Sequence, residues 1–149
     1  MVEPVMSTGE ALPVTPEFLR ALRKAVDQYG LVLLFDEVMT SRVSAGGAQS
    51  HYSVTLDLTA FGKYIGGGLT FGAFGGRADI MDRHGPRRPD ALPQVGTFNN
   101  NALTMANGLP AAGELYTADV ADTHNRTGEA FKGRVNFQQP LRASAPCCL

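Results

Sequence analysis

Apolar side chains recur every three or four residues over 16–29, which predicts a helix. Thr15 just before this segment and Pro16 at its first position form a helix-start signature, and Gly30 is placed to end the helix. The predicted apolar face comprises Phe18, Leu19, Leu22, Ala25, Val26 and Tyr29. An uninterrupted apolar run follows at 31–35, and it has the length of a strand buried on both faces of a parallel sheet. A helix followed by such a strand is typical of an α/β protein.

The remaining sequence predicts further short elements. Residues 1–14 show no periodicity and predict an irregular segment. The other predicted elements are a strand at 58–61, a strand or hairpin at 69–76, a helical turn at 77–83, a loop at 84–96, a helix from about 101 and a last helix over 120–135. Pro110 is expected to kink the first of these two helices or to start a new one.

Composition places the chain among globular proteins. It has 149 residues, the length of a single typical domain, and 44% of them are hydrophobic and 18% charged. A net charge of −1 excludes a broad electrostatic affinity for nucleic acid or anionic membranes. We see no membrane-spanning run or secretory signal, and Cys147 and Cys148 cannot frame a disulfide-rich domain. We therefore expect a cytoplasmic protein.

Glycine is the unusual component, because 9 of the 17 glycines lie between Gly46 and Gly76. Clustered glycines between apolar segments indicate a backbone that turns tightly or approaches something closely. We expect Gly62 and 66–68 to give clearance around Lys63. The prediction for Gly72, Gly75 and Gly76 is that they let the next segment pack close beside it.

The acids Asp36 and Glu37 allow two functional hypotheses. The structural alternative is that they mark an ordinary strand end that reaches solvent. An ATPase magnesium site fails, because Asp57 and Tyr64 occupy positions where a phosphate-binding loop needs Gly and Ser or Thr. In the second hypothesis, Lys63 forms a Schiff base with pyridoxal phosphate (PLP). A carboxylate of Asp36, 27 residues upstream on a neighbouring strand, then holds a proton on the pyridine nitrogen.

Three ordered motifs favour the second hypothesis. LLFDEVMTSR (33–42), LTAFGKYIGGGLTFGAFGG (58–76) and VGTFNNNALTMANG (95–108) resemble segments of the class III PLP-dependent aminotransferases. The likeness is greatest to the branch of glutamate-1-semialdehyde 2,1-aminomutase. It implies a partial fold-type-I large domain, α/β with a mostly parallel sheet flanked by helices, over residues 1–136. The tail at 137–149 lies outside the family pattern, and we expect it to be disordered.

The resemblance also assigns site residues. It implies that Lys63 is the catalytic Schiff-base lysine, that Asp36 pairs with the pyridine nitrogen and that Val38 packs on one face of the ring. Glu37 would be an orienting acid behind them. Thr97 would bind the cofactor phosphate across a dimer interface, in a loop shaped by Gly96 and Phe98. Arg42 is expected to be structural or near the interface. His51, His84 and His124 lack metal-ligand spacing, so no metal is expected.

The function implied is transfer of an amino group from a small-molecule donor to a keto or aldehyde acceptor, by a transaminase or an aminomutase that forms homodimers. The family's chains are much longer, and their main phosphate-binding loop has no counterpart in residues 1–35. We therefore expect the 149-residue chain to be the central third of a larger enzyme, with weak or no activity alone. The alternative is an inactive chain that binds a full-length paralogue.

Overall fold

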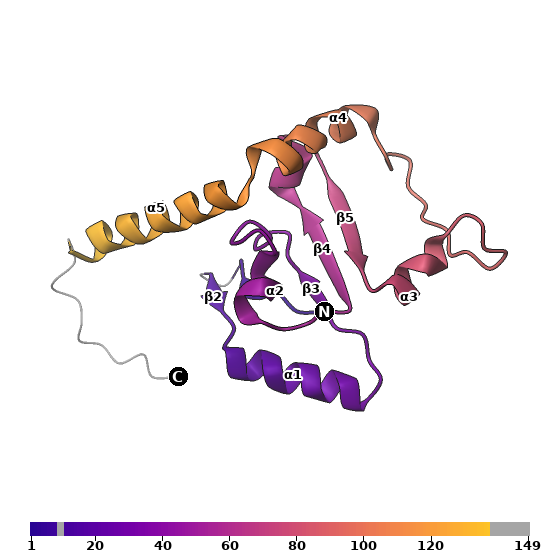
Figure 1. Ribbon diagram of the computed structural model, residues 1–149, viewed down its shortest axis with the longest axis horizontal. Coiled ribbons are helices and arrows are strands. Elements are labelled where there is room, and N and C mark those ends of the chain that lie inside the picture. The colour runs from indigo at the N-terminus through magenta and orange to yellow at the C-terminus, as the bar shows by residue number, and fades with distance from the viewer. Residues whose placement is uncertain (9–10, 138–149) are drawn as a thin grey trace.

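The computed structural model describes residues 1–8 and 11–137, with the elements arranged as in Figure 1. The strands are β1 (Val5–Met6), β2 (Leu12–Pro13), β3 (Leu34–Asp36), β4 (Leu58–Gly62) and β5 (Gly72–Gly76). The α-helices are α1 (Pro16–Gln28), α2 (Gly47–Tyr52), α3 (Ala78–Met81), α4 (Ala102–Pro110) and α5 (Ala118–Phe137). Short 3-10 turns cover Lys63–Gly66 and Asp82–His84, and a π-helical segment covers Ala111–Leu115. The predicted α/β class is confirmed, and the tail at 138–149 lies outside the described residues.

The main sheet has three strands in the order β3-β4-β5. β3 and β4 run parallel, with Asp36 opposite Ala60, as the apolar runs predict. β5 runs antiparallel to β4 and pairs Gly72 with Gly62. A separate antiparallel pair, β1 with β2, was not predicted, because two-residue strands are too short to show an alternating pattern.

The predicted strand at 31–35 is correct in kind but wrong in its bounds. The first two residues of the run are 59% and 51% exposed, and the ladder begins only at Leu34. The Leu33 N–H donates to the Asp57 carboxylate at 2.7 Å rather than to a neighbouring strand. The strand is therefore shorter than its apolar run, since a side chain takes the hydrogen bond that would extend the ladder.

Helix α1 begins where the sequence predicts. Thr15 caps it by accepting a hydrogen bond from the Phe18 N–H at 3.2 Å, and Gly30 after it takes φ +62°. The buried face is narrower than predicted. Leu19 and Val26 are buried, Leu22 is half-buried, and Phe18, Ala25 and Tyr29 are exposed.

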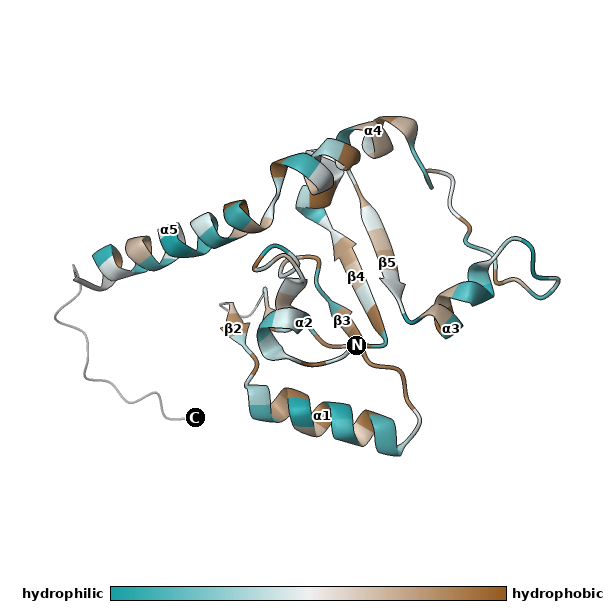
Figure 2. Cartoon of the chain, in the orientation of Figure 1, coloured by the Kyte–Doolittle hydropathy of each residue, from teal (hydrophilic) through white to brown (hydrophobic). Residues whose placement is uncertain are grey.

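The hydrophobic core lies between α1, β3 and the segment that follows α2 (Figures 1 and 2). Its buried members are Leu19, Val26, Leu33, Phe35, Val54 and Leu56. Helix α2 itself was not predicted. Its N-terminal amides are capped by Glu37, which lies 11 residues before Ala48, so no local signal marks its start.

Asp57 is a buried acid that joins three parts of the fold. Its side chain is 5% exposed and pairs with Arg23 of α1 at 2.8 Å and with Arg77 after β5 at 2.9 Å. Burial by itself raises the pKa of the carboxyl. The Leu33 N–H and the two guanidinium groups lower it by more than burial raises it, so the pKa falls to about 2. The carboxylate therefore stays charged and holds the amino-terminal end of β4.

Two close backbone approaches depend on glycine. A Cβ at Gly76 would lie 2.1 Å from the Asp57 carbonyl oxygen, so β5 can pack against β4 there only without a side chain. Gly67, at φ +60°, meets the Asn107 carbonyl of α4, where a Cβ would lie 2.6 Å from the oxygen. The prediction that Gly72 and Gly75 also allow close packing is wrong, because nothing lies within 4 Å of a Cβ added at either position.

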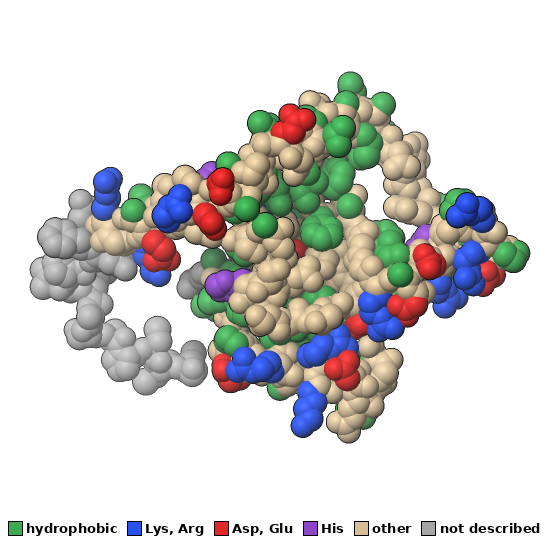
Figure 3. All heavy atoms as spheres, viewed as in Figure 1, with side chains coloured by type: hydrophobic (Ala, Val, Ile, Leu, Met, Phe, Trp, Pro, Cys, Tyr) green, Lys and Arg blue, Asp and Glu red, His purple; other side chains and the backbone are tan. Residues whose placement is uncertain are grey.

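The carboxyl-terminal third follows the predicted helices. Pro110 ends α4, and the chain continues into the π-helical segment rather than breaking. The last helix was predicted at 120–135 and is observed as α5. Hydrophobic side chains gather over the region of α4, whereas charged side chains gather along α1 and around α3 (Figure 3). Within the part of the chain that the structure describes, no helix is long and apolar enough to cross a membrane.

Candidate cofactor site

The carboxyl ends of β3 and β4 bring the two main candidates to one edge of the sheet. Asp36 is the last residue of β3, and Lys63 directly follows β4. The two strands are parallel neighbours in register, with Asp36 opposite Ala60. Ligand sites in open α/β sheets lie outside the carboxyl ends of strands. The structure therefore places Asp36 and Lys63 where the sequence predicts a ligand.

Lys63 stands at the start of a 3-10 turn and projects from the sheet. Its backbone is in the left-handed region at φ +57°, and its side chain is exposed. The Nζ atom contacts the Sδ atom of Met39, in the turn after β3. Non-glycine residues with such a φ cost energy and occur preferentially at functional sites.

Asp36 is half-buried and fixed on its own strand. Its Oδ1 atom accepts a hydrogen bond from the Val38 N–H at 3.1 Å. Its backbone N–H donates to the Val2 carbonyl at 2.9 Å, because Val2 pairs with Phe35 on the outer side of β3. Among the residues that the structure describes, no hydrogen bond reaches the second oxygen of this carboxylate.

Val38 and Gly62 form the wall between these two residues. A Cβ at Gly62 would lie 3.3 Å from Cγ1 of Val38, so the valine packs directly on the glycine backbone. Val38 is half-buried, which leaves part of its side chain free to contact a ring. Packing of Val38 on one face of a cofactor ring, which the family resemblance implies, stays a prediction.

Glu37 has a different role from the predicted orienting acid. Glu37 is fully buried, and its carboxylate accepts hydrogen bonds from the Ala48 N–H at 2.6 Å and the Gln49 N–H at 3.1 Å. It thus caps α2 and secures the loop after β3. Among the described residues, the Glu37 carboxylate forms hydrogen bonds with α2 and Thr40 and none with Asp36 or Lys63.

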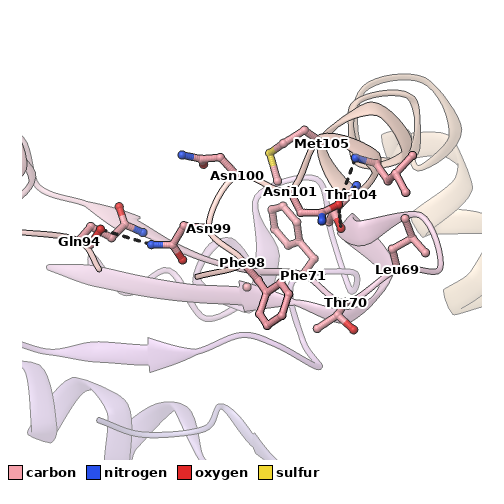
Figure 4. A pocket seen from close by; sticks show the side chains of 12 residues that line it. Leu69, Thr70, Phe71, Gln94, Phe98, Asn99, Asn100, Asn101, Thr104 and Met105 are labelled. Atoms are coloured by element: carbon pink, nitrogen blue, oxygen red, sulfur yellow. Dashed lines mark hydrogen bonds between the residues drawn. The ribbon is translucent and has the colours of Figure 1, made fainter. Parts of the chain in front are cut away.

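Thr97 and Gly96 lie in an exposed loop before α4. The loop turns on a hydrogen bond from the Asn99 N–H to the Gly96 carbonyl at 3.1 Å. Phe98 is 84% exposed and lines a pocket of about 600 Å³ together with side chains from the β5 side and α4 (Figure 4). The lining of this pocket includes neither Lys63 nor Asp36.

Sequence reasoning missed an acid beside this site. Glu3 follows Val2 at the outer edge of β3, and its carboxylate accepts hydrogen bonds from the Ser7 N–H at 3.1 Å and hydroxyl at 3.0 Å. These bonds lower the pKa of Glu3, with a smaller contribution from the charge of Lys63. Glu3 carried no signal in the sequence, since its position depends on a single bridge to Phe35.

A cluster of aromatic side chains supports the turn that carries Lys63. The Tyr64 ring lies 4.6 Å from that of Tyr116 and 5.1 Å from the guanidinium of Arg42. Tyr116 donates to the Arg42 carbonyl at 2.7 Å, and burial raises the pKa of its hydroxyl. Arg42 therefore has the structural role that was expected.

The three histidines take part in packing contacts. His51 packs edge-on to Tyr52, His84 packs on Phe74, and His124 lies 5.7 Å from the Tyr116 ring. Among the described residues, no cluster of three or more His, Cys, Asp or Glu side chains could hold a metal ion.

Comparisons with known proteins show which family this chain resembles. A family model described as aminotransferase class-III matches residues 1–142. The chain is 46% identical over 136 residues to the β-phenylalanine transaminase of Variovorax paradoxus, covering 91% of this chain and 31% of that protein. The crystal structure described for a β-phenylalanine aminotransferase from Variovorax paradoxus matches at a TM-score of 0.79, over 89% of this chain and 31% of that one.

Two further solved structures widen the likeness. A structure described as a transaminase with PLP bound matches at 36% identity and a TM-score of 0.72, over 78% of this chain and 28% of that one. A glutamate-1-semialdehyde aminomutase from Pseudomonas aeruginosa matches at 25% identity and a TM-score of 0.68, over 79% of this chain and 28% of that one.

These matches identify both the fold and the family. The α/β arrangement is part of a fold-type-I PLP transaminase architecture, as the motifs predicted. The chain spans about 30% of the length of the relatives that it matches. Because the family model matches nearly the whole chain, the chain belongs to the class-III aminotransferases.

Proposed function

We propose that this chain provides the lysine site of a PLP-dependent enzyme that transfers amino groups. One observation carries the proposal, namely that Lys63 and Asp36 end adjacent parallel strands and reach the same edge of the sheet. A lysine without a neighbouring carboxylate at this edge would not suit the cofactor, which needs both a covalent anchor and a proton on its ring nitrogen.

The residues at this edge fit PLP. Lys63 would hold the cofactor covalently through its exposed Nζ, and the Asp36 carboxylate would hold a proton at the pyridine nitrogen. Val38, packed on Gly62 between them, would cover one face of the ring. When bound, PLP supplies an electron sink for the negative charge that develops on a substrate carbon. The Lys63 amine, once released, can accept a proton at Nζ and return it elsewhere.

Thr97 and Gly96 would bind the cofactor phosphate from a second copy of the chain. The exposed loop, its glycine turn and the hydroxyl of Thr97 suit a phosphate, and the exposure of the loop leaves it accessible to a second copy of the chain. We accordingly propose a homodimer, with no nucleic acid partner, working in the cytoplasm.

The reaction that we propose is transamination between a small-molecule amino donor and a keto or aldehyde acceptor. The similarity supports this outcome over an aminomutase, since identity is 46% to a transaminase and 25% to an aminomutase. Lys63 and Asp36 would serve either reaction, because both depend on proton transfer at the same lysine.

Reductive trapping tests the proposal without requiring turnover. The chain has three lysines, Lys24, Lys63 and Lys132, so two of them serve as internal references. After incubation with PLP and reduction with borohydride, peptide mass spectrometry should find the pyridoxyl group on Lys63 well before the other two. Lys63→Ala should abolish the selective signal, whereas Lys24→Ala should leave it intact.

Asp36 is tested in the same assay. Asp36→Asn keeps the shape of the side chain but removes its charge, so we expect weaker retention of PLP and an altered visible absorption of the bound cofactor. Equal modification of all three lysines in the parent chain would contradict the proposal and favour an inactive chain that binds a paralogue.

A further inference from the structure

We propose that Tyr64 is a positioning residue for Lys63, and that its ring holds the lysine backbone in the conformation that presents the amine to PLP. The inference rests on the proposed function of Lys63 and adds a second residue to that site. It is based on two observations, namely that the Lys63 backbone is left-handed and that the ring of the next residue is held by Arg42 and Tyr116.

The backbone of Lys63 needs support from its surroundings. Its φ is +57°, in a region where the Cβ atom crowds the backbone, so glycine and asparagine enter it more readily than lysine does. Gly62 before it is extended, and the residues after it continue the 3-10 turn. Conformations of this kind persist only where the surrounding structure fixes them. The neighbours of Lys63 therefore decide whether it keeps this backbone.

The Tyr64 ring is held by two residues that are also bonded to each other. Its centroid lies 4.6 Å from that of the Tyr116 ring and 5.1 Å from the guanidinium carbon of Arg42. Tyr116 donates from its hydroxyl to the Arg42 carbonyl at 2.7 Å, so the two partners keep their separation. Among the described residues Arg42 forms no ion pair, so no carboxylate draws its cation away from the ring. The half-buried ring therefore has a fixed place beside the segment that joins α4 to α5 (Figure 1).

The other contacts of the turn fix positions on either side of Tyr64. The ladder between β4 and β5 ends before Lys63. The backbone contacts with α4 involve Ile65 and Gly67, where a Cβ would lie 2.6 Å from the Asn107 carbonyl oxygen. Tyr64 lies between these regions, and its ring is the side-chain anchor next to the lysine. Without the ring, we expect Lys63 to relax to an ordinary negative φ, which would move its amine away from the edge of the sheet.

The first test measures the rate of pyridoxyl formation at Lys63 in the trapping assay. Tyr64→Leu removes the ring and keeps an apolar side chain, so we expect the rate to fall about 3- to 10-fold, as the loss of an aromatic pair implies. Tyr64→Phe should keep most of the rate, because both contacts are made by the ring. The rates at Lys24 and Lys132 should stay unchanged.

The matched control is Tyr29→Leu, which makes the same exchange of side chains elsewhere. Tyr29 follows α1 and is 71% exposed. The rate at Lys63 should not change in this variant.

The second test needs no cofactor, because it measures the preference of the backbone at position 63. Glycine tolerates the left-handed region and alanine does not, so Lys63→Gly should be more stable than Lys63→Ala. We expect its ratio of folded to unfolded chain, from urea denaturation, to be about 5-fold larger. When Tyr64→Leu is added to both variants, this difference should be lost. A ring that only stabilises the fold would lower both variants equally and leave their difference unchanged.

The outcomes separate the two proposals. A parent rate at Lys63 that is kept in Tyr64→Leu overturns the role of Tyr64, as does a loss in Tyr64→Phe as large as that in Tyr64→Leu. An unchanged difference between Lys63→Gly and Lys63→Ala also overturns it. Selective capture at Lys63 together with any of these results leaves the proposed function standing. A parent chain without selective capture overturns the proposed function, whereas the stability difference still tests whether Tyr64 fixes the backbone.

Discussion

Asp57 carries a buried negative charge immediately before β4, at the end of the strand opposite to Lys63. Its partners are the Leu33 N–H and two guanidinium groups, which come from three different parts of the chain. Replacing the carboxylate by an amide removes the charge and one of the two acceptor oxygens that these donors use. Such a loss destabilises a fold more than the loss of an exposed ion pair does.

We therefore expect Asp57→Asn to lower the free energy of unfolding by about 2 kcal/mol, from the difference between its folded and ordinary pKa. Urea denaturation followed by circular dichroism measures this change. Asp90→Asn is the control, because its carboxylate forms an exposed pair with Arg88 and should matter little. An equal effect of both substitutions would contradict the buried role of Asp57.

The same carboxyl predicts how stability depends on pH. The pKa of Asp57 is lowered from its ordinary 3.8 to about 2, so its contribution is complete above pH 4. It is lost as the pH falls from about 4 to about 2, because the unfolded state takes up the proton first. The parent should lose stability over this range more steeply than Asp57→Asn.

None of the contacts of Asp57 was predicted from the sequence. Its partners lie 20 to 34 residues away, and an isolated acid before an apolar run shows no pattern. The positions of Lys63 and Asp36 at strand ends were predicted, because an apolar run precedes each of them. Glu3 and Tyr64 depend on contacts between separate elements, which periodicity does not show.

At the scale of elements, the elements predicted best are those with local signals. The capping residue Thr15 and the proline at the first position of α1 fix its start. The sequence around α5 predicts that helix to within two residues at each end. Helix α2 and the β1–β2 pair were missed, because the first depends on Glu37 and the second has two residues in each strand. Tertiary contacts decide both.

The attachment of α5 provides a test at this scale. Tyr116, just before the helix, donates to the Arg42 carbonyl at 2.7 Å, and Asn125 on the helix donates to the Val43 carbonyl at 2.8 Å. Tyr116→Phe keeps the ring that packs on Tyr64 and removes the hydroxyl. We expect amide hydrogens in the first turns of α5 to exchange a few-fold faster, for a loss of about 1 kcal/mol.

Hydrogen exchange read by mass spectrometry measures this effect peptide by peptide. Peptides from β3 and β4 should keep their protection in Tyr116→Phe, which serves as the internal control. Thr127→Ala, farther along α5, removes a hydroxyl that bonds within the helix and should not affect its first turns. Faster exchange throughout the sheet would show that Tyr116 supports the whole fold rather than the helix junction.

At the scale of the whole molecule, several strongly exposed apolar side chains lie between residues 95 and 109. Val95 and Phe98 are each 84% exposed, and Leu103 and Leu109 are 70% and 76% exposed. This stretch includes Thr97 and borders the pocket beside α4 (Figures 3 and 4). An apolar surface next to the proposed phosphate contact supports the proposed homodimer.

The dimer proposal predicts that affinity for PLP depends on chain concentration. As the dimer forms, the parent should bind PLP more tightly, because Thr97 reaches the cofactor only from the second copy. Thr97→Val keeps the shape and removes the hydroxyl, so affinity in the dimer should fall about 10-fold. Sedimentation velocity gives the dimer fraction, and absorbance gives bound PLP. A similar loss in the monomer would contradict contact across the interface.

The contact between Gly67 and α4 constrains how this protein can be redesigned. Gly108 of α4 lies against the Ile65 carbonyl, where a Cβ would be 2.8 Å from the oxygen, so each backbone meets the other at a glycine. No side chain at this contact can change rotamer to make room. Combinatorial libraries that vary the surroundings of Lys63 should therefore hold Gly67 and Gly108 constant together.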